Sequence, residues 1–271
     1  MNNIITEKLK AKYQPIVLVR SHTKPENALQ LEAGLNGRCM MDYFCRVVVN
    51  GETAVFDKDT CGCWGAVVAF GFGNGYIKAP VGPRFYSAFF SKGIREAENI
   101  EQYNGVIERV TGLNRDKFVY GERLHPSAER AYKWITEELP IYDFPEKYAI
   151  LKPLAMLEED EIPKSVIFTV NPLELSALII LSGSVTDGAT ELVAPPAASG
   201  CQTFGNYVFA QEESSSPKAV LGLLDLSAKE HIREWIPDEY LTYSMTWSMF
   251  RQMEEAAKEG IFEGALWKYM K

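Results

Sequence analysis

Five cysteines supply the most recognisable reactive groups in this sequence of 271 residues. Cys63 and Cys201 each follow a glycine, and each stands where a helical pattern begins. Backbone N–H groups at the start of a helix stabilise a thiolate, so a cysteine there is a better nucleophile or ligand than an ordinary thiol. We therefore expect Cys63 and Cys201 to flank one small-ligand site. The alternative is that glycine makes a tight turn at each point and cysteine only packs.

The first four cysteines have the spacing C-x5-C-x15-C-x-C, which raises the question of a metal site. Cysteine thiolates hold zinc ions and iron–sulfur clusters in many proteins. Cys39, Cys61 and Cys63 are the candidate ligands, and an iron–sulfur cluster or another metal is the candidate cofactor. The spacing matches neither zinc ribbons nor ferredoxins, and buried cysteine also behaves as a small apolar residue. The sequence favours thiols that are inert or that line a ligand site.

Two charged residues are candidates for the same ligand-binding pocket. Arg38 comes directly before Cys39, and Asp225 ends the apolar run 220–224. Asp225 either points into a site or caps the turn that follows it, and capping is the favoured alternative. The sequence contains no P-loop, no G-x-S-x-G element and no recognisable nucleophile–base pair. The catalytic residues therefore stay unknown, and the sequence does not decide whether the protein is an enzyme.

Charge and composition disfavour some classes of partner. The net charge is −8 and the pI is about 5.1, without a cluster of lysine or arginine. Nucleic-acid binders usually carry a basic stripe, and an anionic membrane surface repels an acidic protein, so we expect neither partner. No hydrophobic run is long enough for a signal peptide or a membrane span, and the odd number of cysteines indicates free thiols. We expect a cytoplasmic protein, and its oligomeric state is not predicted.

Strand and helix patterns alternate along the chain, which is typical of an α/β fold with a mixed sheet. The dipeptide Asn50-Gly51 between two β-branched runs predicts a β-hairpin. No linker rich in proline, glycine or serine divides the chain, so we expect one domain spanning residues 1–271. The expected strands are 15–20, 44–49, 52–56, 148–151, 165–170, 218–226 and 241–245, and the expected helices are 27–33, 63–70, 100–110, 126–139, 172–181, 246–259 and 262–269.

The order of features also suggests two pseudo-repeated halves. In each half an apolar strand leads to a proline with a helical stretch and then to a glycine–cysteine pair. We expect the two strands to be equivalent and the ligand site to lie between the halves. The matching segments are Val17–Arg20, Pro25 and Cys63 in residues 13–145, and Val166–Thr169, Pro172 and Cys201 in residues 146–271.

Several short motifs occur along the chain in a distinctive order. They are Arg38-Cys39, Cys63-Trp64-Gly65-Ala66, Phe70-Gly71-Phe72, Cys201, the run 222–229, the run 241–250, Met253-Glu254 and the run 262–267. This order resembles the domain-of-unknown-function family 169, which comprises uncharacterised bacterial and archaeal proteins. The resemblance covers roughly residues 13–267 and implies a shared fold without a settled activity.

Two departures from the pattern of that family bear on the site. Many members carry further cysteines near the positions of Leu223 and Leu224, and their absence here weakens the idea of a cluster ligated from both halves. Lys229 stands where the family commonly has arginine. Arginine can bind an anion through two parallel hydrogen bonds, whereas lysine at this position contributes only a point charge.

Two classes of function follow from the sequence. The first is a protein that binds a small molecule or cofactor in a cysteine-containing pocket between two halves, with a redox or metal-related role. The second is a non-catalytic interaction or sensor module in which the cysteines only pack. Colour and metal content after purification without oxygen would separate the two classes.

Overall fold

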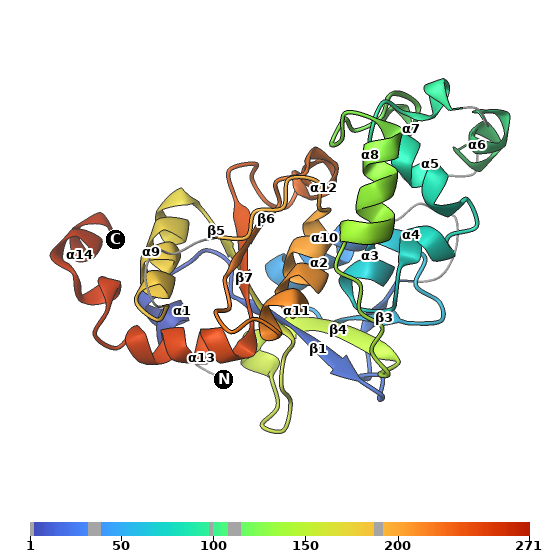
Figure 1. The fold of residues 1–271 in the computed structure, drawn as a ribbon. Helices are drawn as coiled ribbons and strands as arrows, with labels where there is room; N and C mark the ends of the chain where they lie inside the picture. Colours follow the sequence, from blue (N-terminus) through green and yellow to red (C-terminus); the bar gives the residue numbers. More distant parts are fainter. Residues whose placement is uncertain (1–2, 32–38, 98–99, 108–114, 187–191) are drawn as a thin grey trace.

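A seven-stranded sheet forms the centre of the computed structural model, which describes residues 3–31, 39–97, 100–107, 115–186 and 192–271 (Figure 1). The strand order is β2-β3-β4-β1-β5-β7-β6. The pair β2–β3 is parallel and the other neighbours are antiparallel, so the sheet is mixed, as predicted. The strands are β1 Ile16–Ser21, β2 Leu29–Gln30, β3 Ala54–Asp57, β4 Tyr148–Pro153, β5 Ser165–Val170, β6 Val220–Gly222 and β7 Leu241–Met245.

Helices cover both faces of the sheet because its strands bury apolar side chains on both sides (Figure 1). In β1, Ile16 and Leu18 point to one layer, whereas Val17 and Val19 point to the other. The first layer contains α2 Met40–Asn50, α3 Trp64–Ala69, α10 Gly200–Phe204, α11 Asn206–Glu212 and α12 Leu226–Ile232. The second layer contains α1 Ile4–Leu9, α9 Pro172–Gly183, α13 Trp247–Ala256 and α14 Ala265–Met270.

A group of helices between α3 and β4 projects beyond the sheet at the upper right of Figure 1, and we call it the helical lobe. Its core is rich in aromatic residues, and the Phe118 ring contacts the rings of both Phe85 and Phe89. The lobe consists of α4 Gly75–Lys78, α5 Gly82–Phe89, α6 Ile100–Ile107, α7 Asp116–Tyr120 and α8 Ala128–Lys133. Shorter turns are the 3-10 helices Ile94–Glu96, Leu154–Met156 and Ile261–Glu263 and the π-helix Trp134–Glu138.

Local capping explains two of the helix starts that the sequence predicted. The Asn171 side chain accepts from the Glu174 N–H at 3.0 Å and Glu174 accepts from the Asn171 N–H at 3.1 Å, which together with Pro172 begins α9. Thr246 accepts from the Met249 N–H at 3.3 Å and begins α13 directly after β7. These predictions are confirmed.

The predicted hairpin at Asn50-Gly51 is wrong, because residues 40–50 form the helix α2. Phe44, Val47 and Val48 are buried at helical spacing against the sheet, so tertiary packing overrides the strand preference of the β-branched run. Gly51 adopts φ 70°, and its N–H bonds the carbonyls of the last turn. The Asn-Gly pair therefore ends a helix instead of joining two strands.

The two pseudo-repeated halves are not confirmed. β1 and β5 are neighbouring antiparallel strands, and α9 follows Pro172, but the predicted helix over 27–33 does not form in its described part. Asn27 has φ 56°, Leu29 and Gln30 form β2, and residues 32–33 lie outside the described residues. The predicted strand 218–226 is also too long, because Leu226 already begins α12.

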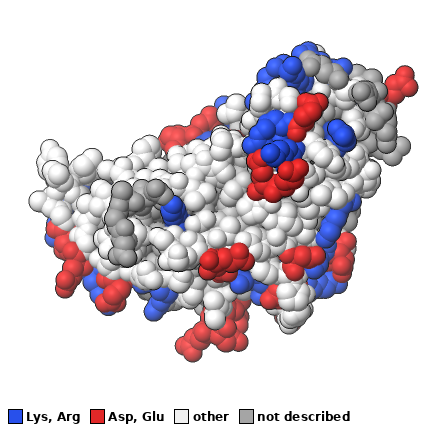
Figure 2. All heavy atoms as spheres, in the orientation of Figure 1, with Lys and Arg blue, Asp and Glu red and all other residues white. Residues whose placement is uncertain are grey.

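None of the helices in the described residues has both the length and the apolar character that crossing a membrane requires. On the face that Figure 2 shows, basic and acidic side chains lie next to one another along the lower edge and on the helical lobe. The charge on that face is thus mixed rather than gathered into one field.

Candidate functional site

Three cysteines that are distant in the sequence come together in the layer that contains α2, α3 and α10, and we call them the thiol cluster. Cys39 is the N-cap residue of α2, Cys63 is the N-cap residue of α3, and Cys201 is the second residue of α10. The Cys39 side chain hydrogen-bonds Cys63, and the pKa of Cys201 responds to the charge of Cys63. The α10 helix packs against both α2 and α3, which explains this convergence.

Cys63 is held as a thiolate by the groups around it. The hydrogen bond from Cys39 is the largest cause that lowers the pKa of Cys63, followed by the N–H groups of Ala66, Met40 and Gly65. Burial opposes these groups, and the balance lowers the pKa to about 6. Cys63 is a partly exposed residue as a whole, although its sulfur is surrounded by these groups. A thiolate at neutral pH is the nucleophilic form of cysteine.

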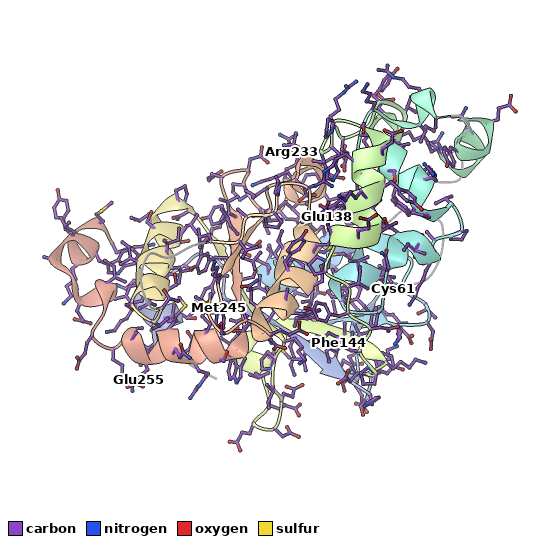
Figure 3. The ribbon with its side chains drawn as sticks, viewed as in Figure 1. Cys61, Glu138, Phe144, Arg233, Met245 and Glu255 are labelled. Carbon is purple, nitrogen blue, oxygen red and sulfur yellow. The ribbon has the colours of Figure 1, made fainter. Side chains whose placement is uncertain are left out.

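The other cysteines remain thiols at neutral pH. The hydrogen bond to Cys63 and burial raise the pKa of Cys39, and burial raises the pKa of Cys201. Burial also raises the pKa of Cys45 and of Cys61 to about 12. The Cys61 thiol lies 3.7 Å from the Cys63 carbonyl oxygen, near the start of α3 in Figure 3. All five cysteines are free.

The position over Gly65 has room for one Cβ atom and adjoins the thiol cluster, and we call it the Gly65 space. A Cβ atom placed on Gly65 would lie 3.6 Å from Tyr76 Oη, 3.8 Å from Cys201 Sγ and 3.9 Å from Ser199 Oγ. Gly65 is partly exposed, whereas Tyr76 and Gln202 are buried. The Gln202 amide donates to Tyr76 Oη at 3.1 Å, and its oxygen accepts from the Ser199 N–H at 2.9 Å. The polar groups around this space are therefore held in fixed orientations.

Asp225 lies beside the thiol cluster at the start of α12. Its Oδ2 atom accepts from the Ala228 N–H at 3.0 Å, so the predicted capping role is confirmed. Its Oδ1 atom is buried without a hydrogen-bond partner, and a Cβ on Gly200 would lie 3.4 Å from it. Burial raises the pKa of Asp225 to about 6, and Asp225 in turn raises the pKa of Cys201. The carboxyl group is thus part of the electrostatics of the site.

A second polar cluster joins the helical lobe to α12. The Lys117 ammonium donates to Ser227 Oγ at 2.8 Å and pairs with Glu230 at 3.2 Å. Glu122 hydrogen-bonds Ser227, and burial raises the pKa of Glu122 to about 7. The sequence contained no signal for this cluster, because its members come from segments that meet only in the folded chain.

The structure brings together most of the residues that the sequence selected. Cys63 and Cys201 share one cluster with Cys39, and Asp225 adjoins it, whereas Arg38 lies outside the described residues. In the part of the chain that is described, no group of three or more His, Cys, Asp or Glu side chains is arranged to hold a metal ion. Sequence reasoning missed Tyr76 and Gln202, although Tyr76 follows the glycine-rich loop that ends α3.

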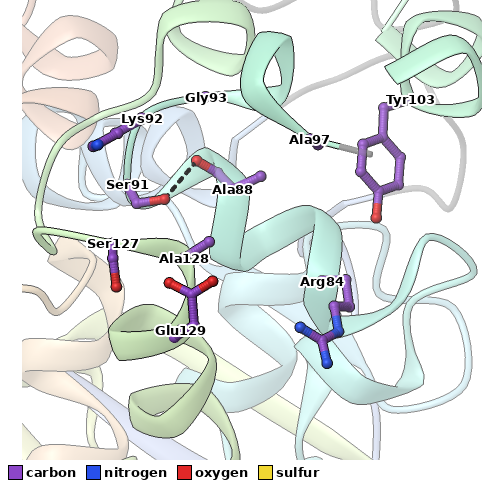
Figure 4. Close-up of a pocket in the computed structure, with 10 residues that line it drawn as sticks. All are labelled: Arg84, Ala88, Ser91, Lys92, Gly93, Ala97, Tyr103, Ser127, Ala128 and Glu129. Carbon is purple, nitrogen blue, oxygen red and sulfur yellow. Dashed lines mark hydrogen bonds between the residues drawn. The ribbon is translucent and has the colours of Figure 1, made fainter. Parts of the chain in front are cut away.

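Two cavities lie away from the thiol cluster. One of about 660 Å³ is in the helical lobe, and Arg84, Lys92 and Glu129 are among the residues that line it (Figure 4). Another of about 390 Å³ lies beside β1 and β4, where Lys152 pairs with Glu161 at 2.5 Å. None of the predicted site residues lines either cavity. The two cavities are therefore separate from the cysteine site.

The fold and the site define an α/β protein with a mixed sheet and a thiolate beside two further thiols. The model of the DUF169 family, described as uncharacterised ArCR, matches residues 4–256. The chain therefore belongs to this family, as the order of its motifs predicted. Neither a curated protein nor a solved structure gives a significant match to the chain.

Proposed function

We propose that this protein is a thiol-dependent redox protein in which Cys63 reacts with a small oxidant and Cys39 provides the second thiol. One observation carries the proposal, which is the hydrogen bond between the Cys39 thiol and a Cys63 whose pKa lies near 6. A low-pKa thiolate next to a second thiol is the arrangement found at redox-active cysteines. In this proposal, the cysteine-containing site that the sequence predicted between two halves consists of the Cys39–Cys63 pair.

The proposed reaction balances with one small oxidant and two thiols. With a hydroperoxide, Cys63 forms a sulfenic acid and the oxidant leaves as an alcohol or water. Cys39 then attacks the Cys63 sulfur, a disulfide forms and water is released. With a disulfide, Cys63 forms a mixed disulfide, and attack by Cys39 releases the second thiol. In both cases the cysteine pair loses two electrons and the oxidant gains them.

Cys39 fits the role of second thiol better than Cys201. Cys39 is partly exposed and hydrogen-bonds Cys63, whereas Cys201 is 3% exposed and lies next to the Asp225 carboxyl group. A negative charge nearby disfavours the thiolate that an attack on Cys63 requires. We also infer a cytoplasmic location, because the reducing cytosol would return the disulfide to two thiols.

Disulfide mapping tests the proposal directly. The reduced protein is treated with one equivalent of hydrogen peroxide and digested without reduction, and the cross-linked peptides are identified by mass spectrometry. We expect a Cys39–Cys63 disulfide. Cys39→Ser should instead accumulate a sulfenic acid on Cys63 that dimedone traps, and Cys63→Ser should prevent the cross-link.

Cys45→Ser is the matched control, because Cys45 is buried and burial raises its pKa to about 12. This variant should form the Cys39–Cys63 disulfide as the parent protein does. Oxidation that leaves Cys63 unmodified, or that occurs equally on Cys45, would contradict the proposal. That outcome would favour the alternative in which the thiols only pack within an interaction or sensor module.

A further inference from the structure

The larger cavity lies in the helical lobe, and its walls come from α5, the turn after α5, α6 and the start of α8 (Figure 4). Its volume of about 660 Å³ is in the range of pockets that bind small molecules. The turn after α5 is fixed, because Gly93 and Gly121 lie where a Cβ atom would overlap backbone atoms at 2.1 and 2.2 Å. A ring contact between Phe85 and Tyr103 at 5.2 Å holds α6 against α5. The walls of the cavity are therefore held in one arrangement.

Two basic side chains and one acidic side chain line this cavity. Arg84 belongs to α5, Lys92 to the turn after it and Glu129 to the first turn of α8. The Glu129 N–H and the Ser127 hydroxyl are the main causes that lower the pKa of Glu129, and the charges of Arg84 and Lys92 lower it further. Both cations therefore act on the place where this carboxylate lies. The three lining charges leave a net charge of one positive unit.

The hydrogen-bond donors of the two cations are available to a ligand. The Arg84 guanidinium carbon lies 4.6 Å from the centre of the Tyr132 ring, and this contact uses the charge of the group without using its N–H groups. Among the described residues, neither Arg84 nor Lys92 forms an ion pair with a carboxylate. By contrast, Arg130 on the same side of the lobe pairs with Glu138 at 2.8 Å.

We propose that this cavity binds a small organic carboxylate, whose anionic group is held by Arg84 and Lys92. A net charge of one positive unit matches a monoanion, whereas the Glu129 carboxylate disfavours a phosphate dianion. Arginine N–H groups also match the two oxygens of a carboxylate. Ala88 and the Tyr103 ring provide apolar contacts for the rest of the molecule. The cavity shares no residue with the thiol cluster, so this inference does not rest on the proposed redox function.

Fluorine NMR tests the proposal on the full-length protein, with 4-fluorobenzoate as the probe. We expect a saturable change of the fluorine signal, because this probe combines one carboxylate with an apolar ring. The neutral analogue 4-fluorobenzamide has the same shape without the charge and should bind about tenfold more weakly or worse. The absence of saturable binding, or equal affinities for the two probes, would overturn the proposal. Tighter binding of 4-fluorophenyl phosphate would overturn the choice of a carboxylate.

Variants of the lining residues locate the probe in the cavity. Arg84→Gln and Lys92→Gln, at exposed positions, should each weaken 4-fluorobenzoate binding about threefold or more, and Glu129→Gln should strengthen it. Arg130→Gln is the matched control, because Arg130 is exposed but does not line the cavity, and it should change the affinity less than about twofold. Ala128→Leu fills the cavity without a change of charge and should abolish binding. Binding that survives Ala128→Leu, or that falls equally in Arg130→Gln and Arg84→Gln, would overturn this location.

Discussion

Cys39 and Cys63 are the N-cap residues of two different helices, and their side chains are hydrogen-bonded to each other. Each helix start contributes N–H groups to the same sulfur, Met40 from α2 and Gly65 and Ala66 from α3. A thiolate at this point is therefore stabilised by parts of the chain that only the fold brings together.

The pH dependence of alkylation should single out Cys63. Since its pKa is lowered to about 6, the reaction of Cys63 with iodoacetamide should be half-maximal near that pH and level above neutrality. Cys45 and Cys61, with pKa values raised to about 12, should stay unreactive in the same samples. Peptide mass spectrometry across the pH range measures all three thiols at once. A Cys63 profile that still rises above pH 8 would contradict the assignment.

Replacement of Cys39 should change the acidity of Cys63, because its hydrogen bond is the largest cause of the low pKa. Cys39→Ala removes the donor, and the midpoint of Cys63 alkylation should rise by about one pH unit or more. Cys39→Ser keeps a hydroxyl donor and should shift the midpoint less. Equal midpoints in the two variants would show that the hydrogen bond is not the cause.

Filling the Gly65 space should impair the reaction without weakening the fold. A Cβ on Gly65 makes ordinary contacts of 3.6 to 3.9 Å, and alanine in a helix is about 0.5–1 kcal/mol more favourable than glycine. Gly65→Ala should therefore keep or raise the free energy of unfolding while slowing oxidation of Cys63 by peroxide and by DTNB several-fold. Gly105→Ala in α6, where a Cβ meets no atom within 4 Å, should leave both rates unchanged. Unchanged rates in Gly65→Ala would place the reaction elsewhere.

Glu122 should make stability fall as the pH rises. Its pKa is raised from 4.5 to about 7, so the folded protein keeps a proton that the unfolded chain releases. The contribution of protonated Glu122 to the free energy of unfolding is fully present below pH 4.5 and is lost as the pH rises through about 7. Glu122→Gln should therefore match the parent at pH 4 and exceed it at pH 8 by about 1–2 kcal/mol in urea unfolding. Glu230→Gln, which removes a partner of Lys117, should give no such gain.

Gly205 should tolerate no side chain. It separates α10 from α11, and a Cβ there would overlap the carbonyl group of Ala69 at the end of α3. Gly205→Ala should cost about 3 kcal/mol or more in unfolding free energy, or prevent soluble expression. Chemical denaturation measures this free energy for Gly205→Ala and for Gly65→Ala, whose added Cβ makes only ordinary contacts. Equal stability of the two variants would contradict the close approach of these helices.

Interactions between residues that are close together in the sequence were sufficient to predict much of the fold. The starts of α9 and α13 depend on side chains that cap N–H groups within the next three residues, and each helix directly follows a mostly buried strand, β5 or β7. The position of Cys63 before a helix was predictable from the apolar run of small residues that follows it. The family, too, followed from the order of short motifs.

Tertiary packing decided what local preference left open. The run 44–49 fits a strand or a helix, and burial against the sheet made it part of α2, with Gly51 as its end. Cys39, Tyr76 and Gln202 meet at one site because α4 and α10 pack against α3 and α10 also packs against α2. The sequence by itself determined which thiols were available. Only the folded structure decided which one is a thiolate, because the N–H groups and the second thiol that stabilise it come from separate segments.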